Sequence, residues 1–252
     1  MTKFVCIASG KGGTGKTTTT LNLGLALSKY RDVTIIDGNI STPNIALHLG
    51  IQNLPIYLNH VLQGKKKIMQ SVYTHKNLKV IPSSIFLKDI RQTDHKKLKT
   101  EIRKLKDLTD IVLIDSSAGL SDEVVSCMRA SDELLIITNP DLPSVTDSLK
   151  TVKLAEELNV PITGVILNKV SGKHDLSKKE IEKILEYPII GLIPEDPNIP
   201  SSIKLTKPIL HSFPNSPASI SYKQLAADLT GNTYEGYKEE NIVSRILDFF
   251  GL

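Results

Sequence analysis

A glycine-rich segment near the start of the chain restricts the fold more than any other feature. It reads Gly10-Lys11-Gly12-Gly13-Thr14-Gly15-Lys16-Thr17, which fits the pattern GxxxxGK[ST]. An apolar run (residues 4–8) precedes it, and a helical pattern (17–28) follows it. Glycines let successive backbone N–H groups turn inward on a phosphate, and the helix presents its positive N-terminal end to the same anion. The segment therefore predicts a phosphate-binding loop between a first strand and a first helix.

The rest of the chain repeats the alternation of strand and helix. Further apolar runs, bounded by turn residues, occur at 33–36, 78–81, 111–114, 134–138, 162–167 and 189–193. Helical patterns occur at 94–105, 121–130, 145–158, 177–185 and 218–229, and the Pro-rich segment 194–217 is expected to be a loop. Continuous apolar runs are typical of strands covered on both faces. The sequence thus predicts one α/β domain (1–236) with a doubly wound, mostly parallel sheet, followed by a separate C-terminal element (237–252).

Composition excludes several classes of protein. Of the 252 residues, 40% are apolar and 23% charged, which excludes a disordered chain. The two cysteines, Cys6 and Cys127, form no CxxC motif, so a disulfide framework or zinc ribbon is not expected. No apolar run approaches the roughly 18 residues of a spanning helix. We expect a cytoplasmic protein whose membrane contact, if any, is peripheral.

Acidic residues at strand ends are candidate metal ligands. In a P-loop, Lys16 places its charge at the β- and γ-phosphates and the Thr17 hydroxyl binds Mg²⁺. Asp115 directly follows an apolar strand and is the expected acidic partner of the metal, although an Asp after a strand is more often a helix cap or a turn residue. Asp37 ends a second such strand. Because parallel strands bind ligands at their carboxyl ends, these residues are expected to converge on a nucleoside triphosphate and Mg²⁺.

The loop sequence from Lys11 to Thr18, KGGTGKTT, resembles the variant phosphate-binding motif of the MinD/ParA family of ATPases. The resemblance extends over most of the chain. Asp37-Gly38-Asn39 with Pro43-Asn44 is similar to the family's switch I, and the segment Ile114-Asp115-Ser116-Ser117-Ala118-Gly119 to its switch II. Asn168-Lys169 and Ile193-Pro194-Glu195-Asp196 are similar to its adenine-side loops. Within the family, the switch II and Ile-Pro-Glu-Asp patterns resemble MinD most.

The resemblance implies a Mg-ATP-dependent homodimer that positions cellular components at the inner face of the cell membrane, with an unidentified protein partner or activator. It implies that Lys11 of one subunit reaches the nucleotide of the other, and that Asp37 and residue 39 position or activate the attacking water. From spacing alone, Asn168 could contact adenine or cap its own loop, and the resemblance favours adenine. Glu195 and Asp196 could contact the base or ribose, or use only their backbone while both carboxylates face water.

The C-terminal segment 239–252 is strongly amphipathic. On a helix its apolar side chains occupy one contiguous arc: Ile242, Val243, Ile246, Leu247, Phe249 and Phe250. The same stripe would suit packing on the body of the protein or on a partner. Two adjacent aromatic residues after a polar break favour an interfacial membrane helix, as in relatives of the MinD type. Its excess of acidic residues opposes attraction to anionic lipid.

Two other functions remain open. Basic runs at 65–67 and 96–106 could contact DNA, as in ParA-type relatives, or be solvated helix faces. The chain could also be a scaffold that binds ATP with little hydrolysis, because position 39 holds Asn where the family usually has a second Asp. A salt-dependent affinity of the ATP form for duplex DNA would identify the first alternative.

Asn39 generates a prediction about rate. Its amide can orient water but cannot accept a proton, so we expect slow hydrolysis and a long-lived ATP dimer. Asn39→Asp should hydrolyse ATP faster in a single-turnover assay, with Lys16→Ala as the blank. An unchanged rate would count against any catalytic role for this position.

Overall fold

A central sheet organises the computed structural model, which describes residues 1–51, 53–172 and 175–234. Within these residues the sheet has eight strands in the order β3-β4-β2-β5-β1-β6-β7-β8. All neighbouring strands run parallel except the edge strand β3, which is antiparallel to β4. The predicted doubly wound, mostly parallel α/β fold is confirmed.

The strands agree closely with the predicted apolar runs. They are β1 (Lys3–Ala8), β2 (Val33–Asp37), β3 (Tyr73–His75), β4 (Leu78–Ile81), β5 (Ile111–Asp115), β6 (Glu133–Thr138), β7 (Ile162–Val170) and β8 (Ile189–Pro194). The short strand β3 is new, because three residues with no buried side chain carry no apolar pattern.

The helices are more numerous than the sequence predicts. The α-helices are α1 (Lys16–Leu27), α2 (Ile45–His48), α3 (Leu58–Leu62), α4 (Leu87–Arg91), α5 (Leu98–Ile102), α6 (Asp122–Ala130), α7 (Leu142–Glu157), α8 (Lys178–Leu185), α9 (Asn198–Lys204), α10 (Ile209–Ser212) and α11 (Pro217–Thr230). Short 3-10 helices are η1 (Ile68–Ser71), η2 (His95–Lys97) and η3 (Arg103–Leu105).

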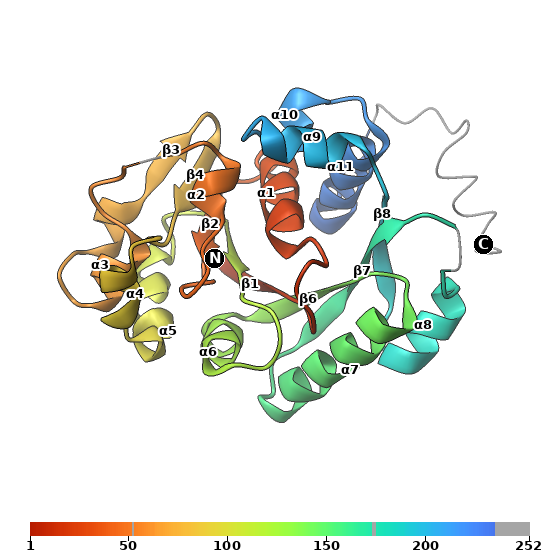
Figure 1. Ribbon diagram of the computed structural model, residues 1–252, viewed down its shortest axis with the longest axis horizontal. Coiled ribbons are helices and arrows are strands. Elements are labelled where there is room, and N and C mark those ends of the chain that lie inside the picture. Colours follow the sequence, from red (N-terminus) through yellow and green to blue (C-terminus); the bar gives the residue numbers. More distant parts are fainter. Residues whose placement is uncertain (52, 173–174, 235–252) are drawn as a thin grey trace.

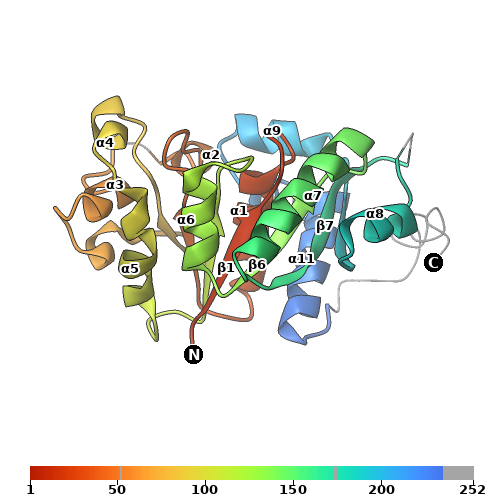
Figure 2. The same cartoon turned by 90° about the horizontal axis from the view of Figure 1, so that it is seen from below.

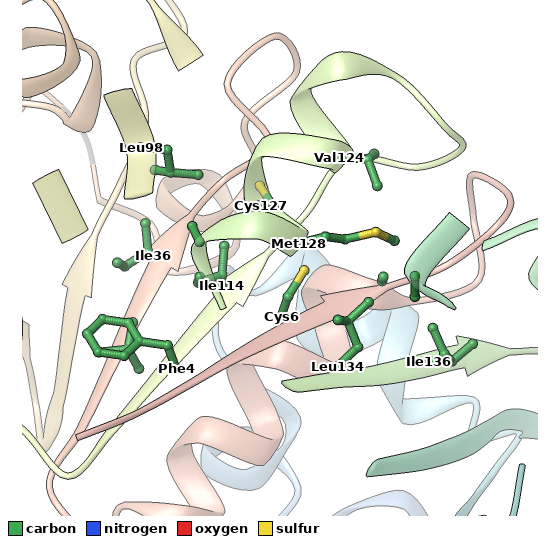
Figure 3. Packing of buried hydrophobic residues seen from close by; sticks show 14 of the residues in the cluster. Phe4, Cys6, Ile36, Leu98, Ile114, Val124, Cys127, Met128, Leu134 and Ile136 are labelled. Atoms are coloured by element: carbon green, nitrogen blue, oxygen red, sulfur yellow. The ribbon is translucent and has the colours of Figure 1, made fainter. Parts of the chain in front are cut away.

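Helices cover both faces of the sheet, as Figures 1 and 2 show: α1, α10 and α11 lie on one side, and α6, α7 and α8 on the other. Successive residues of β1 therefore enter two different cores. Phe4 and Cys6 join the cluster that includes the α6 residues Cys127 and Met128 (Figure 3), whereas Ile7 joins the cluster beneath α1 and α11. Burial on both faces explains why the strands read as continuous apolar runs.

Two predicted segments need correction. Residues 94–105 do not form one helix but η2, α5 and η3 in succession. Lys96, Lys99 and Arg103 would stack on one face of a continuous helix, where like charges repel. The expected loop at 194–217 contains α9 and α10. Pro200 lies in the first turn of α9, where a missing N–H costs no helical hydrogen bond.

The predicted membrane segment, including Ile242 to Phe250, and the proposed boundary at residue 236 lie outside the described residues. In the described part of the chain, no helix combines the length and apolarity needed to cross a bilayer.

The buried strands predict where the chain is sensitive to truncation. Leu134 on β6 is fully buried, so Leu134→Ala should lower the free energy of unfolding by about 2–5 kcal/mol, because it removes apolar contacts and leaves a cavity. Leu108 is 49% exposed, and Leu108→Ala should change it by less than about 0.5 kcal/mol. Urea denaturation measures both; equal losses would contradict the assigned core.

Candidate functional site

The glycine-rich loop connects β1 to α1 at the point where the sheet changes direction of winding. β1 lies between β5 and β6, so the loop leaves the carboxyl edge at the crevice where open α/β sheets bind ligands. Gly15 has φ of +96°, and a Cβ there would lie 2.2 Å from Nδ2 of Asn168. A Cβ on Gly10 would lie 2.0 Å from the backbone oxygen of Asp147. Only glycine fits these two positions.

Lys16 is buried at the base of this loop, with its Nζ 3.0 Å from Oγ of Ser9. Burial lowers the pKa of Lys16, while the nearby negative charge of Asp115 opposes that shift. The ammonium group is therefore held by neutral and acidic protein groups inside the cradle. A phosphate there would gain a cation that is already desolvated and fixed.

Asp115 joins the end of β5 to the first turns of α1. Thr17 donates a hydrogen bond of 2.6 Å to one carboxylate oxygen, and Thr20 donates one of 3.2 Å to the other. Asp115 is fully buried, and burial raises its pKa to about 6 against the lowering effect of Thr17 and Lys16. A hydroxyl and a buried carboxylate side by side are hard oxygen donors of the kind that Mg²⁺ prefers. The predicted metal ligands thus lie together and fit the ion.

Asp37 lies beside Asp115, because the two residues are paired in the β2–β5 register. One oxygen of Asp37 accepts 3.1 Å hydrogen bonds from the N–H groups of Asn44 and Ile45; the other is buried and has no partner in the described structure. Burial, reinforced by the charge of Asp115, raises the pKa of Asp37 well above its usual value. Besides the Thr17–Asp115 pair, this unpartnered oxygen also suits a cation or an ordered water.

The switch I loop is folded on itself around Asn39. The Asn39 amide donates 2.6 Å to the Thr42 carbonyl, and its oxygen accepts from the Thr42 N–H and hydroxyl. Glu123 of α6 accepts hydrogen bonds from the Ser41 N–H and hydroxyl. Asn39 therefore lies at the site but is engaged with its own loop, and its predicted role on water stays a prediction.

A cavity of about 630 Å³ opens beside these groups. The phosphate loop and α1 contribute Gly12, Gly13, Gly15, Lys16, Thr17 and Thr18, switch I contributes Asn39, Thr42 and Asn44, and switch II contributes Ser116 and Ala118. The rest of the lining comes from the ends of β7 and β8, from α9 and from α2: Asn168, Lys169, Glu195, Asp196, Ile199, Pro200, Ile203 and His48. The other predicted residues lie outside this lining: Thr14, Asp37, Asp115 and Pro194 are buried, Gly10 is half-buried and Lys11 is exposed.

The structure corrects one predicted alternative for Asp196 and adds a contact of Asn168. Asp196 is 4% exposed, and its carboxylate accepts from the N–H groups of Asn198 and Ala218, so it caps α9 and α11 and does not face water. Nδ2 of Asn168 donates 2.7 Å to the Thr14 carbonyl. Oδ1 of Asn168 is buried without a partner in the described structure, so it stays a candidate contact for a base.

Sequence reasoning missed the apolar wall of the cavity. Ile199, Pro200 and Ile203 come from α9, within the segment expected to be a loop. Lys169 follows Asn168 at the end of β7, and its Nζ donates a hydrogen bond of 2.9 Å to the Gly13 carbonyl of the loop. The spacing of Ile199 and Ile203, four residues apart, is the only helical signal in this short segment.

The comparisons with known proteins agree with this geometry. A family model described as ParA, NUBPL iron-transfer P-loop NTPase, matches residues 1–230. An uncharacterised ATP-binding protein of Methanocaldococcus jannaschii is 36% identical over 249 residues, 96% of this chain and 94% of that protein. The septum site-determining protein MinD of Pyrococcus horikoshii, complexed with Mg-ADP, has a TM-score of 0.87 at 32% identity and covers 91% of this chain and 96% of its own. A chain of the MinC:MinD cell division complex of Aquifex aeolicus has a TM-score of 0.82 at 28% identity, covering 94% and 98%.

The raised pKa of Asp115 predicts how stability depends on pH without metal. A folded-state pKa of about 6, above the value of 3.8 for a free Asp, means that the folded state binds the proton more tightly. The free energy of unfolding should therefore fall as pH rises from about 4 to 6 and level off above it, by up to about 3 kcal/mol.

The comparison is with Asp115→Asn, in which the group cannot titrate. In EDTA, the free energy of unfolding of the wild type should fall relative to that of the variant as pH rises across that range. A difference independent of pH would show that the carboxylate titrates normally.

Proposed function

The chain belongs to the ParA family of P-loop NTPases, and from this premise we propose that it is a Mg-ATP-dependent dimerisation switch with slow ATP hydrolysis. The switch positions cellular components at a membrane in the manner of MinD, the septum site-determining protein to which it is similar over 100% of its length at 28% identity in Bacillus subtilis.

The observation that carries this proposal is the cavity. Its lining includes the phosphate loop and the buried Lys16, with the Thr17–Asp115 hydrogen bond beside it. The lining also includes Ile199 and Ile203 of α9 and Asn168, whose amide oxygen has no partner in the described structure. The loop and its fixed lysine suit a triphosphate, and the apolar side chains with an amide suit a purine base. A volume of about 630 Å³ suits a ligand of nucleotide size.

The chain's own residues supply most of the proposed mechanism. Bound Mg²⁺ would neutralise charge on the phosphate oxygens, with Thr17 and Asp115 as its protein ligands. Lys16 and the backbone N–H groups of the loop hold the phosphates in line, which costs no reorganisation because they are already fixed. Asp37 and Asn39, at the start of switch I, orient the attacking water.

Lys11 is the proposed contact between subunits. It is exposed and lies outside the lining of its own cavity, although it belongs to the phosphate loop. A lysine so placed has its charge available to a second nucleotide. Two chains that close on two ATP molecules would each receive a cation, which makes ATP part of the interface.

Membrane association is assigned to the amphipathic segment 239–252. One such tail gives marginal hold, whereas two tails on one ATP dimer make the second insertion intramolecular. Nucleotide state would then control residence at the membrane through avidity.

One observation keeps a second function in view. The side-chain oxygen of Asn39 already accepts two hydrogen bonds from Thr42, so accepting one from water would require it to release that residue. A chain that binds ATP and dimerises with negligible turnover would be a scaffold. Single-turnover rates separate the two functions.

Dimerisation is tested with Lys11→Ala. With ATP and Mg²⁺, the wild type should double its mass in size-exclusion chromatography with light scattering, and Lys11→Ala should remain monomeric while its affinity for ATP changes less than about threefold. Lys16→Ala should lose at least tenfold in ATP affinity.

Lys29, an exposed lysine two residues after the end of α1, provides the matched control, because Lys29→Ala should behave like wild type. The same proteins in vesicle flotation test the membrane step: the ATP form should float and Phe249→Glu/Phe250→Glu should not. A Lys11→Ala protein that dimerises normally would refute the shared-nucleotide interface.

A further inference from the structure

Positive charge is concentrated in one part of the chain. Residues 65–106, here termed the basic lobe, contain thirteen Lys and Arg against three Asp and Glu, a net charge of +10. The remaining residues contain eighteen against twenty-four, a net charge of −6. The lobe runs from the end of α3 through β3, β4, α4 and α5, at the β3–β4 edge of the sheet (Figure 1). Such segregation is the electrostatic footprint of an anionic partner.

Each of the three acidic side chains of the lobe has a hydrogen bond or an ion pair. Asp89 accepts from the Ser84 hydroxyl at 2.7 Å and pairs with His60, and Asp94 caps η2 by accepting from the Lys96 N–H. Glu101 pairs with Lys104. In the described structure, nine exposed cations of the lobe make no side-chain hydrogen bond or ion pair: Lys66, Lys67, Lys76, Lys88, Arg91, Lys96, Lys97, Lys99 and Lys106. Their charge is therefore available to a partner.

The same lobe exposes apolar side chains in sequence. Ile85, Phe86 and Leu87 are 52%, 52% and 67% exposed, directly before Lys88. Their backbone is fixed from below, because the Ser84 N–H donates 2.6 Å to the Asn59 side chain and the Phe86 N–H donates to the Ser84 hydroxyl. Three adjacent exposed apolar residues on a fixed turn indicate an interaction surface.

A groove extends the cationic surface toward α6. It has a volume of about 400 Å³ and is lined by His95, Lys96 and Lys99 on one side and by Arg129 of α6 on the other. Asp122, Val125 and Ser126 complete the lining. The groove is thus predominantly cationic and separate from the nucleotide cavity.

We propose that the basic lobe is a second membrane-contacting surface, which binds the anionic headgroups of a lipid bilayer through its lysines and inserts Phe86 and Leu87 at the interface. Two features favour a bilayer over nucleic acid. A phosphate backbone has no apolar layer to receive the triplet, whereas a bilayer presents phosphates and acyl chains together. Eleven of the thirteen cations are Lys, flexible point charges that suit a fluid layer of headgroups.

This surface rests on the proposed membrane association and supplies what the tail lacks. Residues 235–252 contain two cations, Lys238 and Arg245, against four acidic residues, Glu235, Glu239, Glu240 and Asp248. An interfacial helix that binds anionic lipid usually carries Lys and Arg on its polar face. In this chain the tail would supply the apolar insertion, and the lobe would supply the electrostatic attraction to anionic lipid.

The test is vesicle binding of the full chain with ATP and Mg²⁺, using phosphatidylcholine vesicles with and without phosphatidylglycerol. Lys66→Glu/Lys88→Glu/Arg91→Glu should lower affinity for the anionic vesicles at least tenfold and remove its salt dependence. Phe86→Ser/Leu87→Ser should lower it as well. The matched control Lys179→Glu/Lys183→Glu/Lys207→Glu makes the same charge change on exposed lysines of α8 and the α9–α10 turn and should bind like wild type.

The outcomes separate the lobe from the tail. If the lobe variants bind anionic vesicles like wild type while Phe249→Glu/Phe250→Glu does not bind, the lobe proposal is wrong and the membrane function stands. If no protein binds either vesicle, both fail. If the lobe variants lose affinity only for duplex DNA, the surface is a nucleic-acid site and the lipid assignment is overturned.

Discussion

The contact between Asp115 and the first turn of α1 is the constraint on which the site depends. Two threonine hydroxyls of α1 donate to this carboxylate, and the nearby charge of buried Lys16 lowers its pKa. β5 and α1 are therefore held in one arrangement in the absence of a ligand. The arrangement is unfavourable for an isolated charge, since burial raises the pKa of Asp115 to about 6. A divalent cation at this carboxylate would relieve that desolvation cost. Binding of a cation at this site would therefore increase the free energy of unfolding.

The same charge reaches switch I through Asp37. Because Asp37 and Asp115 are paired in adjacent strands, a change of charge at one alters the pKa of the other. Asp37 in turn accepts from the N–H groups that begin α2, and Glu123 of α6 holds the middle of the same loop. Occupation of the metal position would therefore act on both ends of a hydrogen-bonded loop. That is a short physical route from nucleotide state to the surface of the protein.

What could be predicted from sequence follows the same physics. Strands buried on both faces are continuous apolar runs, and glycines with positive φ are required by the loop, so the fold, the loop and the convergence of Thr17 with Asp115 were predictable. The wall formed by Ile199 and Ile203 was not, because a seven-residue helix depends on packing more than on its own pattern. Nor could spacing show that Asp196 caps two helices or that Asn168 binds the phosphate loop, since both depend on residues distant in sequence.

The distribution of charge would separate the two proposed tasks within one small domain. Exposed charges are screened over about 8 Å at physiological ionic strength, so lysines at the β3–β4 edge add little to the potential felt by a phosphate beneath Lys16. A chain with its excess cations near the loop would bind free anions in competition with nucleotide. Because residues 65–106 carry a net charge of +10 and the rest of the chain −6, substitutions in the lobe can change the attraction to a charged surface without changing the buried phosphate loop. Affinity at the nucleotide site depends on burial and fixed geometry, whereas affinity at the lobe depends on exposed charges that salt screens.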